Sequence, residues 1–305
     1  MALHKIIIDW YTHNQRDLPW RKSDCTPWGI LVSEVMLQQT PVVRVLPRWE
    51  AWMARWPTPE ACAQASKSDI LKMWDRLGYP RRALRLHAAA QAITTQGFFP
   101  ANYQELRELP GVGDYTASAV SCFAFKNKEV VIDTNIRRVQ ARAITGTALP
   151  APTLNASEKK LAAQLLPQQR LKSVQWNAAI MELGALVCTA KAPSCHQCPI
   201  HHECQWIKAG RPEAQYQPRG QTWQGTDRQV RGAIMAILRH ASKEIPEELL
   251  TGPIVNTNYA EEEVQQHLAK LKKLQAPQKQ RQKAVETLLQ DGLASSYKQG
   301  LSLPQ

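Results

Sequence analysis

The sequence predicts a mainly α-helical protein, because helix-forming stretches recur along the chain and β-branched runs are few. Residues 81–96 are rich in Ala and Leu, which favour helices. In residues 156–166 and 170–188, apolar residues recur at the spacing of one helix face. The clearest β-branched run is Val130-Val131-Ile132. The residues with helical spacing are Leu161, Leu165, Ile180, Leu183 and Val187.

Short segments that contain proline or glycine separate the predicted helices. Proline lacks a backbone N–H and glycine readily adopts turn conformations, so both interrupt helical patterns. The segments are Trp56-Pro57-Thr58-Pro59, Gly78-Tyr79-Pro80, Gly97 and Leu109-Pro110-Gly111. Each of them marks a predicted helix boundary.

The composition changes after residue 207. Residues 208–229 are rich in Gly, Pro, Gln and charged residues and lack periodicity, which is typical of a linker. Helical spacing returns from Val230, and an Asp291-Gly292 turn precedes a final short strand. Helices followed by a strand predict a small, winged-helix-like domain over 230–305, and a plain helical bundle is the alternative.

The charge of the chain favours a polyanionic partner. Its 305 residues include 38 Lys and Arg against 26 Asp and Glu, a formal net charge of +12. Nucleic acid is the simplest partner for such a surplus, although a merely basic protein has the same composition. No apolar run approaches the roughly 18 residues of a membrane span, and the N-terminal apolar stretch is too short for a signal peptide. We therefore expect a cytoplasmic protein without a membrane partner.

Four cysteines near residue 200 form the strongest local signal. Cys188, Cys195, Cys198 and Cys204 have the spacing C-x6-C-x2-C-x5-C. An odd total of seven cysteines without an export signal argues against a disulfide framework. Structural zinc sites usually contain two short cysteine pairs, whereas only one is present here, so an iron–sulfur cluster fits better.

A glycine-containing turn lies between two predicted helices. In Leu109-Pro110-Gly111-Val112-Gly113, the glycines allow a sharp turn that presents backbone N–H groups at the start of a helix. Such a turn binds a phosphate without reading a base. The turn resembles a helix–hairpin–helix DNA-binding motif, although proline and glycine also form ordinary helix–helix turns.

Two carboxylates are candidates for catalysis. Glu34 lies among apolar residues, where desolvation raises a carboxyl pKa and allows it to act as a general acid. Asp133 follows an apolar run at a helix start, where it can cap the helix, stabilise a developing cation, or do both. A surface position for Glu34 is the alternative. Gln38 and Gln39 follow Glu34, and their amides suit hydrogen bonding to base edges.

These motifs, taken in order, resemble the adenine DNA glycosylases of the MutY family, within the helix–hairpin–helix base-excision superfamily. The resemblance runs from about Ile8 to Cys204 and is closest to the short actinobacterial branch. Its motifs are Asp17-Leu18-Pro19-Trp20-Arg21, Ser33 to Thr40, Leu77-Gly78-Tyr79, the hairpin, the Asp133 segment, Glu182-Leu183-Gly184-Ala185 and the cysteines.

The resemblance implies a role for each matching residue. Glu34 would protonate adenine and Asp133 would stabilise the sugar cation, with Tyr115 and Asn135 supporting them. The remaining implied residues are Trp20 and Arg21 at the adenine pocket, Leu37, Gln39, Thr40 and Tyr79 near the opposite base, Gly111, Val112 and Gly113 on DNA, and Cys188, Cys195, Cys198 and Cys204 on a 4Fe-4S cluster. The implied partner is double-stranded DNA with a mispaired adenine, opposite 8-oxoguanine or guanine, bound by a monomer.

The resemblance also implies the domain organisation. The catalytic region, 1–207, would contain a six-helix barrel over about 25–130 and a helical cluster domain from 1–24 and 131–207, followed by the linker 208–229. Two departures from the family pattern affect lesion recognition. Pro80 stands where the family commonly has a second aromatic residue, and the tail shows little resemblance to the NUDIX-like domain that longer members use to recognise 8-oxoguanine.

Two alternatives remain at this point. Endonuclease-III-like glycosylase/lyases for oxidised pyrimidines carry a nucleophilic Lys two residues after the hairpin, where this chain has Tyr115. A non-catalytic lesion-binding iron–sulfur protein would need neither Glu34 nor Asp133. The residues therefore favour a monofunctional glycosylase.

Overall fold

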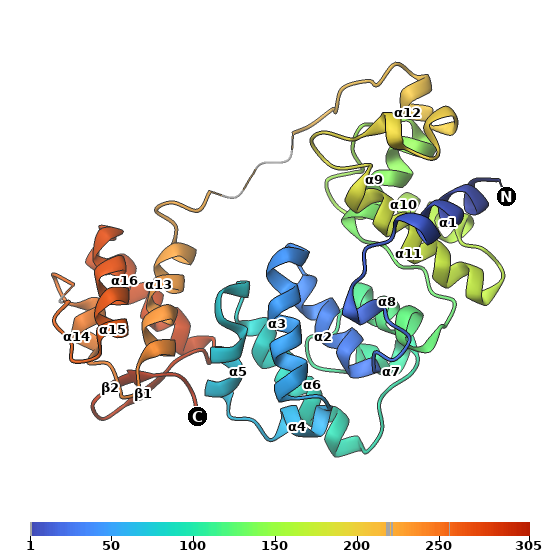
Figure 1. Cartoon of the computed structure of the whole chain (residues 1–305). Helices are drawn as coiled ribbons and strands as arrows, with labels where there is room; N and C mark the ends of the chain where they lie inside the picture. The colour runs from blue at the N-terminus through green and yellow to red at the C-terminus, as the bar shows by residue number, and fades with distance from the viewer. Residues whose placement is uncertain (1, 218–219, 221, 256) are drawn as a thin grey trace. The chain divides into compact units, whose positions relative to one another are not determined.

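The structure is a computed structural model that describes residues 2–217, 220, 222–255 and 257–305 (Figure 1). The chain divides into two compact units, each built from two separate segments. The first unit contains Met1–Glu34 and Phe99–Arg219, and the second contains Val35–Phe98 and Gly220–Gln305. The division into a barrel and a cluster domain stays a prediction.

The mainly helical fold is confirmed. In the first unit the elements are α1 (Ala2–Asn14), η1 (Pro19–Arg21), most of α2 (Pro27–Leu37), α7 (Tyr103–Arg107), α8 (Asp114–Phe125), α9 (Thr134–Gln140), η3 (Ala141–Thr145), α10 (Ala156–Leu165), α11 (Arg170–Leu186), η4 (Cys195–Gln197), η5 (His201–Glu203) and α12 (Gln205–Lys208). The β-branched run 130–132 lies in the connection between α8 and α9, outside regular secondary structure.

Helix α11 lies at the centre of the first unit, because both α1 and α9 pack against it. Trp176 and Leu183 of α11 share one hydrophobic core with Ile7 of α1 and Ile136 of α9, and all four are at most 2% exposed. This packing joins the N-terminal segment to residues more than a hundred positions later. It also fixes the start of α9, where Asp133 lies.

The second unit contains the end of α2 and two groups of helices. Its further elements are α3 (Val42–Arg55), α4 (Pro59–Ala63), α5 (Lys67–Trp74), η2 (Asp75–Leu77), α6 (Arg81–Gln96), α13 (Asp227–His240), α14 (Glu247–Thr251), α15 (Glu262–Lys273), α16 (Gln278–Gln290), β1 (Ser295–Tyr297) and β2 (Gly300–Ser302). Helix α6 matches the predicted helix 81–96. Helix α13 begins three residues before Val230, because Thr226 caps it by accepting a hydrogen bond from the Gln229 N–H.

The C-terminal module, residues 222–255 and 257–305, has the element order of a winged helix. Helices α13, α15 and α16 are followed by the antiparallel hairpin β1–β2, and Ile245 forms a bridge with Leu301 of that hairpin. Gly300 is required at this crossing, because a Cβ there would lie 2.1 Å from the Ile245 carbonyl oxygen. The winged-helix-like arrangement predicted for the tail is therefore present.

The C-terminal module is anchored to the rest of the second unit. Helix α13 packs against α5, and the Arg239 guanidinium of α13 donates to the Leu71 carbonyl at 3.1 Å. Asp291 accepts ion pairs from Arg81 of α6 at 3.1 Å and from Arg231 of α13 at 2.5 Å. No helix in the described part of the chain is long and apolar enough to cross a membrane.

Candidate active site and nucleic-acid interface

Glu34 is a buried carboxyl group on α2, a helix whose other side chains carry no charge. Burial raises the pKa of Glu34 from 4.5 to about 7, and the nearby Asp133 carboxylate contributes to the rise. A hydrogen bond from Tyr115 and the positive charge of Arg21 lower the pKa and so limit the shift. Glu34 is therefore protonated in a substantial fraction of molecules at neutral pH, and the surface alternative is wrong.

Tyr115 reaches Glu34 from the first turn of α8. Its hydroxyl group donates to Glu34 Oε2 at 2.8 Å. Burial, followed by the charges of Glu34 and Asp133, raises the pKa of Tyr115 well above 10, so the hydroxyl remains a donor. The turn before α8 thus brings the Tyr115 hydroxyl group to the Glu34 carboxyl group and also presents a helix N-terminus.

Asp133 caps α9, and its charge also acts on Glu34. Its Oδ1 accepts from the Ile136 N–H at 2.6 Å, and its Oδ2 accepts from the Asn135 side-chain amide at 2.7 Å. Burial raises the pKa of Asp133, and these hydrogen bonds oppose that rise. The capping and catalytic interpretations are therefore compatible, because capping fixes the carboxylate beside Glu34.

A hydrogen-bonded chain connects Asp133 with the cysteine segment. The Asn135 side chain donates to Asp133 and accepts from Arg138 Nη2 at 2.8 Å. Arg138 also donates to the carbonyl oxygens of Gly184 and Cys188, each at 2.7 Å. Gly184 permits this arrangement, because a Cβ there would lie 2.7 Å from the Asn135 Cβ. The position of Asn135 therefore depends on the end of α11.

Arg21 is held by a buried carboxylate. It donates to both oxygens of Glu182 at 2.7–2.9 Å, and Arg16 donates to the same oxygens at 2.6–2.8 Å. Burial alone would raise the pKa of Glu182, but the two arginines lower it to about 2. Trp20, next in the chain, is 8% exposed. Arg21 thus acts on Glu34 through its charge while its donors are occupied by Glu182.

Arg82 holds together the two turns that contain the predicted opposite-base residues. Its guanidinium donates to the carbonyl oxygens of Val35 at 2.8 Å, Gly78 at 3.0 Å and Gln38, and to the Thr40 hydroxyl at 3.1 Å. The Arg82 side chain is 9% exposed. One buried cation therefore fixes the backbone of both turns.

The two turns present different side chains to solvent. Gln39 and Tyr79 have positive φ angles of 56° and 48°, and Tyr79 is 44% exposed. The Arg82 guanidinium lies 5.6 Å from the centre of the Tyr79 ring, and Arg228 of α13 donates to the Tyr79 hydroxyl at 3.3 Å. Thr40, by contrast, is 6% exposed and donates to the Leu77 carbonyl at 3.1 Å. Leu37 and Gln38 are half-buried.

The hairpin has the geometry of a phosphate-binding turn. Gly111 has a φ of 78°, the Val112 N–H donates to the Leu109 carbonyl at 3.1 Å, and Val112 is buried. Gly113 is the N-cap of α8, whose first N–H groups point along the helix axis without intrahelical acceptors. An anion can therefore bind at this end of α8.

The four clustered cysteines line one small cavity, together with Arg142 and Trp206. Arg142 donates to Cys188 Sγ at 3.5 Å and to the Thr189 carbonyl at 2.7 Å, and its guanidinium lies 4.8 Å from the Trp206 ring centre. Within the described residues, no three His, Cys, Asp or Glu side chains are arranged to hold a single metal ion. A cubane cluster separates its ligand sulfurs more widely than one ion does, so a set of four thiols around one cavity fits a cluster.

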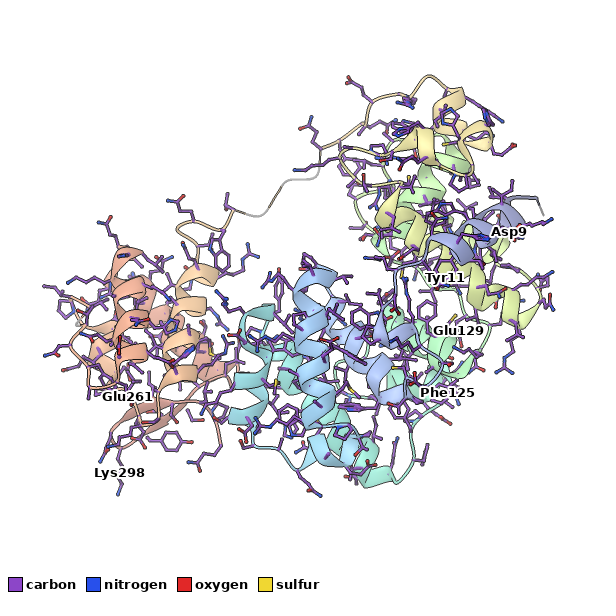
Figure 2. The ribbon with its side chains drawn as sticks, in the orientation of Figure 1. Asp9, Tyr11, Phe125, Glu129, Glu261 and Lys298 are labelled. Atoms are coloured by element: carbon purple, nitrogen blue, oxygen red, sulfur yellow. The ribbon has the colours of Figure 1, made fainter. Side chains whose placement is uncertain are left out.

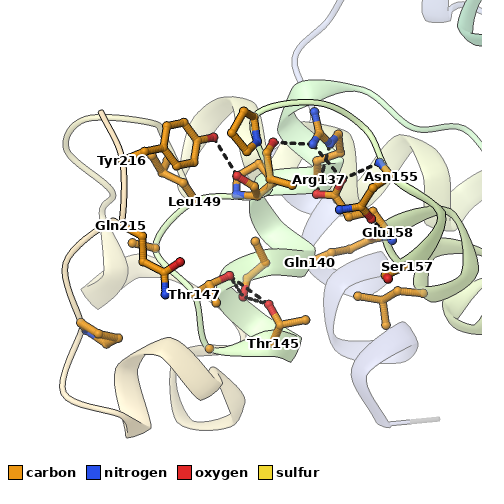
Figure 3. Close-up of a pocket in the computed structure, with 18 of the residues that line it drawn as sticks. Arg137, Gln140, Thr145, Thr147, Leu149, Asn155, Ser157, Glu158, Gln215 and Tyr216 are labelled. Carbon is orange, nitrogen blue, oxygen red and sulfur yellow. Dashed lines mark hydrogen bonds and ion pairs between the residues drawn. The ribbon is translucent and has the colours of Figure 1, made fainter. Parts of the chain in front are cut away.

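A second pocket of the first unit lies beside α10 and is lined by residues of α9, η3 and α10 (Figure 3). Its arginine, Arg137, is paired with Glu158 at 2.8 Å, and Tyr216 donates to the Pro150 carbonyl at 2.7 Å. Because the positive charge is already neutralised, the pocket does not favour an anion. It shows instead that the chain as far as Tyr216 remains attached to the first unit.

Comparisons with known proteins agree with this geometry. Residues 32–163 match the HhH-GPD superfamily base excision DNA repair protein. The chain is 49% identical over 239 residues to the adenine DNA glycosylase of Mycobacterium tuberculosis, covering 77% of this chain and 78% of that one. It is 39% identical over 215 residues to the human adenine DNA glycosylase, covering 67% of this chain and 39% of the human one.

Solved structures show the same fold. A thermostable thymine-DNA glycosylase aligns with a TM-score of 0.60 and 27% identity, covering 68% of this chain and 96% of that chain. An endonuclease III in a non-covalent DNA complex aligns with a TM-score of 0.58 and 20% identity, covering 69% of this chain and 96% of that chain. Fold and site together define a helix–hairpin–helix DNA glycosylase of base excision repair. The chain belongs to the adenine DNA glycosylase family.

The sequence analysis gave no role to three residues that position these segments, although Glu182 stands in one of the family motifs. Arg82 fixes two turns, Arg138 connects Asn135 with the cysteine segment, and Glu182 holds Arg21. A signal was present for Glu182, since a single acid within the apolar stretch 180–186 needs a buried partner. Arg82 and Arg138 each stand in pairs of arginines, and the sequence does not show which member of a pair is buried.

Proposed function

We propose that the protein removes mispaired adenine, opposite 8-oxoguanine or guanine, from duplex DNA by acid-assisted cleavage of the N-glycosidic bond. The observation that carries the proposal is the buried Glu34 carboxyl group with a pKa of about 7, beside Asp133. A protonated acid next to an ionised carboxylate is the pair that departure of a base through a sugar cation requires.

The reaction begins with adenine turned out of the base stack, because Glu34 cannot reach a base inside the duplex. The Glu34 proton passes to an adenine ring nitrogen, and the electrons of the C1′–N9 bond leave with the base. The Asp133 carboxylate stabilises the resulting oxocarbenium ion. Water then adds to C1′ and loses a proton to the Glu34 carboxylate, so the products are free adenine and an abasic site.

Tyr115 supports a monofunctional reaction. A lyase forms a Schiff base through an amine, whereas Tyr115 presents a hydroxyl group that is hydrogen-bonded to Glu34. The tyrosine can orient the acid but cannot form an imine with the sugar. We therefore propose that water is the nucleophile and that the DNA strand remains intact.

The other predicted residues divide between contact and positioning. Trp20 would line the adenine pocket, and Arg21 would supply charge near it. Gln39 and Tyr79 are exposed on turns and suit contacts with the opposite base, whereas the buried Thr40 suits a positioning role. The remaining residues would support the opposite-base turn or present the hairpin to a phosphate: Leu37, Gln38, Gly111, Val112 and Gly113.

A 4Fe-4S cluster fits the four cysteines that line one cavity. Cys188, Cys195, Cys198 and Cys204 would hold it, and a bound cluster would supply a rigid covalent anchor for the segment that follows α11. Arg142 binds this segment through the Thr189 carbonyl and the Cys188 sulfur. No step of base removal passes through the cluster.

We also propose that the enzyme acts on DNA as a monomer, in the cytoplasm. The test is single-turnover base release from duplexes with A opposite 8-oxoguanine, G or C, by the wild type and Glu34→Gln. The amide cannot deliver a proton, so release should fall by about 10²–10⁴ while DNA binding persists. Near-normal release by Glu34→Gln, or efficient strand cleavage by the wild type, would contradict the proposal.

A further inference from the structure

A positively charged surface lies on the C-terminal module, which the proposed base-removal reaction does not use. From Val264 to Val285 the chain contains no Asp or Glu. The lysines of this stretch are all exposed, and they lie at the end of α15 and the beginning of α16. They are Lys270, Lys272, Lys273, Lys279 and Lys283.

The acidic residues that precede this stretch lie at the other end of α15. Glu261, labelled in Figure 2, is the N-cap of that helix. Its carboxylate accepts from the Ser242 N–H and hydroxyl groups at 3.0 and 2.9 Å. A helix rises by about 1.5 Å per residue, so Glu261 and Lys272 are separated by about 16 Å along the axis. The lysines of α15 are therefore separated from the acidic residues at the other end of the same helix.

Packing determines that the lysines face outward. Val264, Leu268 and Leu271 of α15 are buried at no more than 1% exposure. In α16 the one buried cation is Arg281, which donates to the Leu250 carbonyl at 2.9 Å and to the carbonyl of Ala276. Arg281 thereby fixes the turn between the helices and takes no part in the surface charge.

Two helices joined by a short turn and followed by a β-hairpin have the proportions of a DNA-binding helix–turn–helix. The turn comprises residues 274–277, and Lys298 lies at the tip of the hairpin (Figure 2). In such motifs the second helix enters the major groove while neighbouring groups bind phosphates. The exposed face of α16 contains Lys279 and Gln282, which can donate to phosphates or base edges.

We propose that α15, the turn and α16 form a second duplex-binding site, which takes the DNA that flanks the lesion. The ion pairs of Asp291 with Arg81 and Arg231, and the bond from Arg239 to the Leu71 carbonyl, fix this site to the unit that contains Tyr79. A duplex that binds Tyr79 is therefore presented to a rigid second surface. The proposal does not depend on which base the enzyme removes.

The test is a triple substitution in the full-length chain, with Lys272, Lys273 and Lys279 changed to Gln. Lys283 is left in place, because it pairs with the Asp227 carboxylate at 3.0 Å. Binding to an undamaged duplex of about 30 base pairs is measured against salt concentration, so base removal does not enter the result. Affinity near 0.1 M salt should fall by roughly tenfold or more. The slope of log affinity against log salt should become shallower by about 0.9 for each phosphate that is no longer neutralised.

The matched control changes the same three lysines to Arg, which retains the charge and should retain both affinity and slope. Thermal unfolding of both variants checks that the module remains folded. On a duplex with A opposite 8-oxoguanine, the Gln variant should protect the DNA backbone less on one side of the lesion only. The proposal would be overturned if the Gln variant kept the wild-type DNA affinity and salt slope, or if its footprint became weaker without becoming shorter. It would also be overturned if this surface bound an acidic protein while the Gln variant kept its DNA affinity.

Discussion

At the scale of single residues, the proposed mechanism depends on an acid, Glu34, whose pKa is set by its surroundings. Burial raises the pKa of Glu34, the Asp133 carboxylate raises it further, and Tyr115 lowers it through a hydrogen bond to the charged form. The resulting value of about 7 lies where a general acid is both protonated and able to release its proton.

The pH dependence of base removal should follow this carboxyl group. Glu34 must be protonated to donate, so the single-turnover rate should fall as pH rises through about 7. In Tyr115→Phe the hydrogen bond that favours the charged form is absent, so the pKa of Glu34 should rise and the alkaline limb should move to higher pH. Rates measured across the range from acidic to alkaline pH test this direction. If the alkaline limb stays in place or moves to lower pH, Tyr115 does not lower the pKa of Glu34.

At the scale of elements, buried cations and one glycine position the segments that carry the site. Arg82 holds the turn after α2 and the turn before α6, while Arg138 joins α9 to the end of α11. Each arginine donates hydrogen bonds to backbone carbonyl groups of irregular segments, which have no partners in regular secondary structure. The exposed residues of the two turns are therefore positioned by Arg82, a side chain that is itself almost fully buried.

Arg82→Lys should destabilise the fold and misplace Tyr79. An ammonium group has three donors without the planar fork of arginine, so several buried carbonyl groups would be left without partners. We expect the free energy of unfolding to fall by at least about 2 kcal/mol, together with weaker binding to mispaired duplex. Denaturant unfolding and a binding titration measure both. Arg85→Lys, an exposed position on the same helix, is the control and should change neither.

Gly184→Ala, at the contact between α9 and α11, should lower base release by displacing Asp133 and not only by destabilising the fold. The added methyl group would lie 2.7 Å from the Asn135 Cβ, so the start of α9 and Asp133 must move. Overpacking of this kind costs about 1–3 kcal/mol, and base release should fall by more than the fraction of unfolded protein explains. Leu186→Ala, at a side chain that is 38% exposed, is the control. Equal rates for both variants would show that Gly184 does not position Asp133.

The cysteine segment should contain iron. Purified protein should be yellow-brown with about four iron atoms per chain when fully loaded, and Cys198→Ser should lower iron content and DNA affinity together. Cys25→Ser, outside the cluster of cysteines, should retain both. Stoichiometric zinc in protein prepared under iron-replete conditions would contradict the assignment.

At the scale of the whole molecule, the C-terminal module belongs structurally to the unit that contains α3–α6. Its helix α13 packs on α5, and Arg228 at the start of that helix reaches the Tyr79 hydroxyl. The module is therefore in a position to affect how Tyr79 meets DNA, even though it lies more than a hundred residues later in the sequence.

Deletion of residues 208–305 should weaken binding to all duplexes and flatten its salt dependence, because fewer phosphates are neutralised. Deletion also uncovers the α5 surface against which α13 packs, so the melting temperature should fall. The measurement compares, across salt concentrations, the affinities for duplexes with A opposite 8-oxoguanine, A opposite G and full pairing. If only the preference for 8-oxoguanine disappears while general affinity stays intact, the module reads the lesion instead.

The sequence by itself determined the helices over 81–96, 156–166 and 170–188, the hairpin turn and the candidate groups Glu34, Asp133 and the four cysteines, because helix formation, turns and ligand spacing are local properties. The tertiary structure alone decided the protonation of Glu34, since its hydrogen-bond donor Tyr115 is 81 residues away and its burial depends on packing. The tertiary structure also decided how charge is distributed over the surface of the C-terminal module. Helix geometry separates Glu261 from Lys272, which linear sequence places close together, and so converts a mixed run into a positive surface.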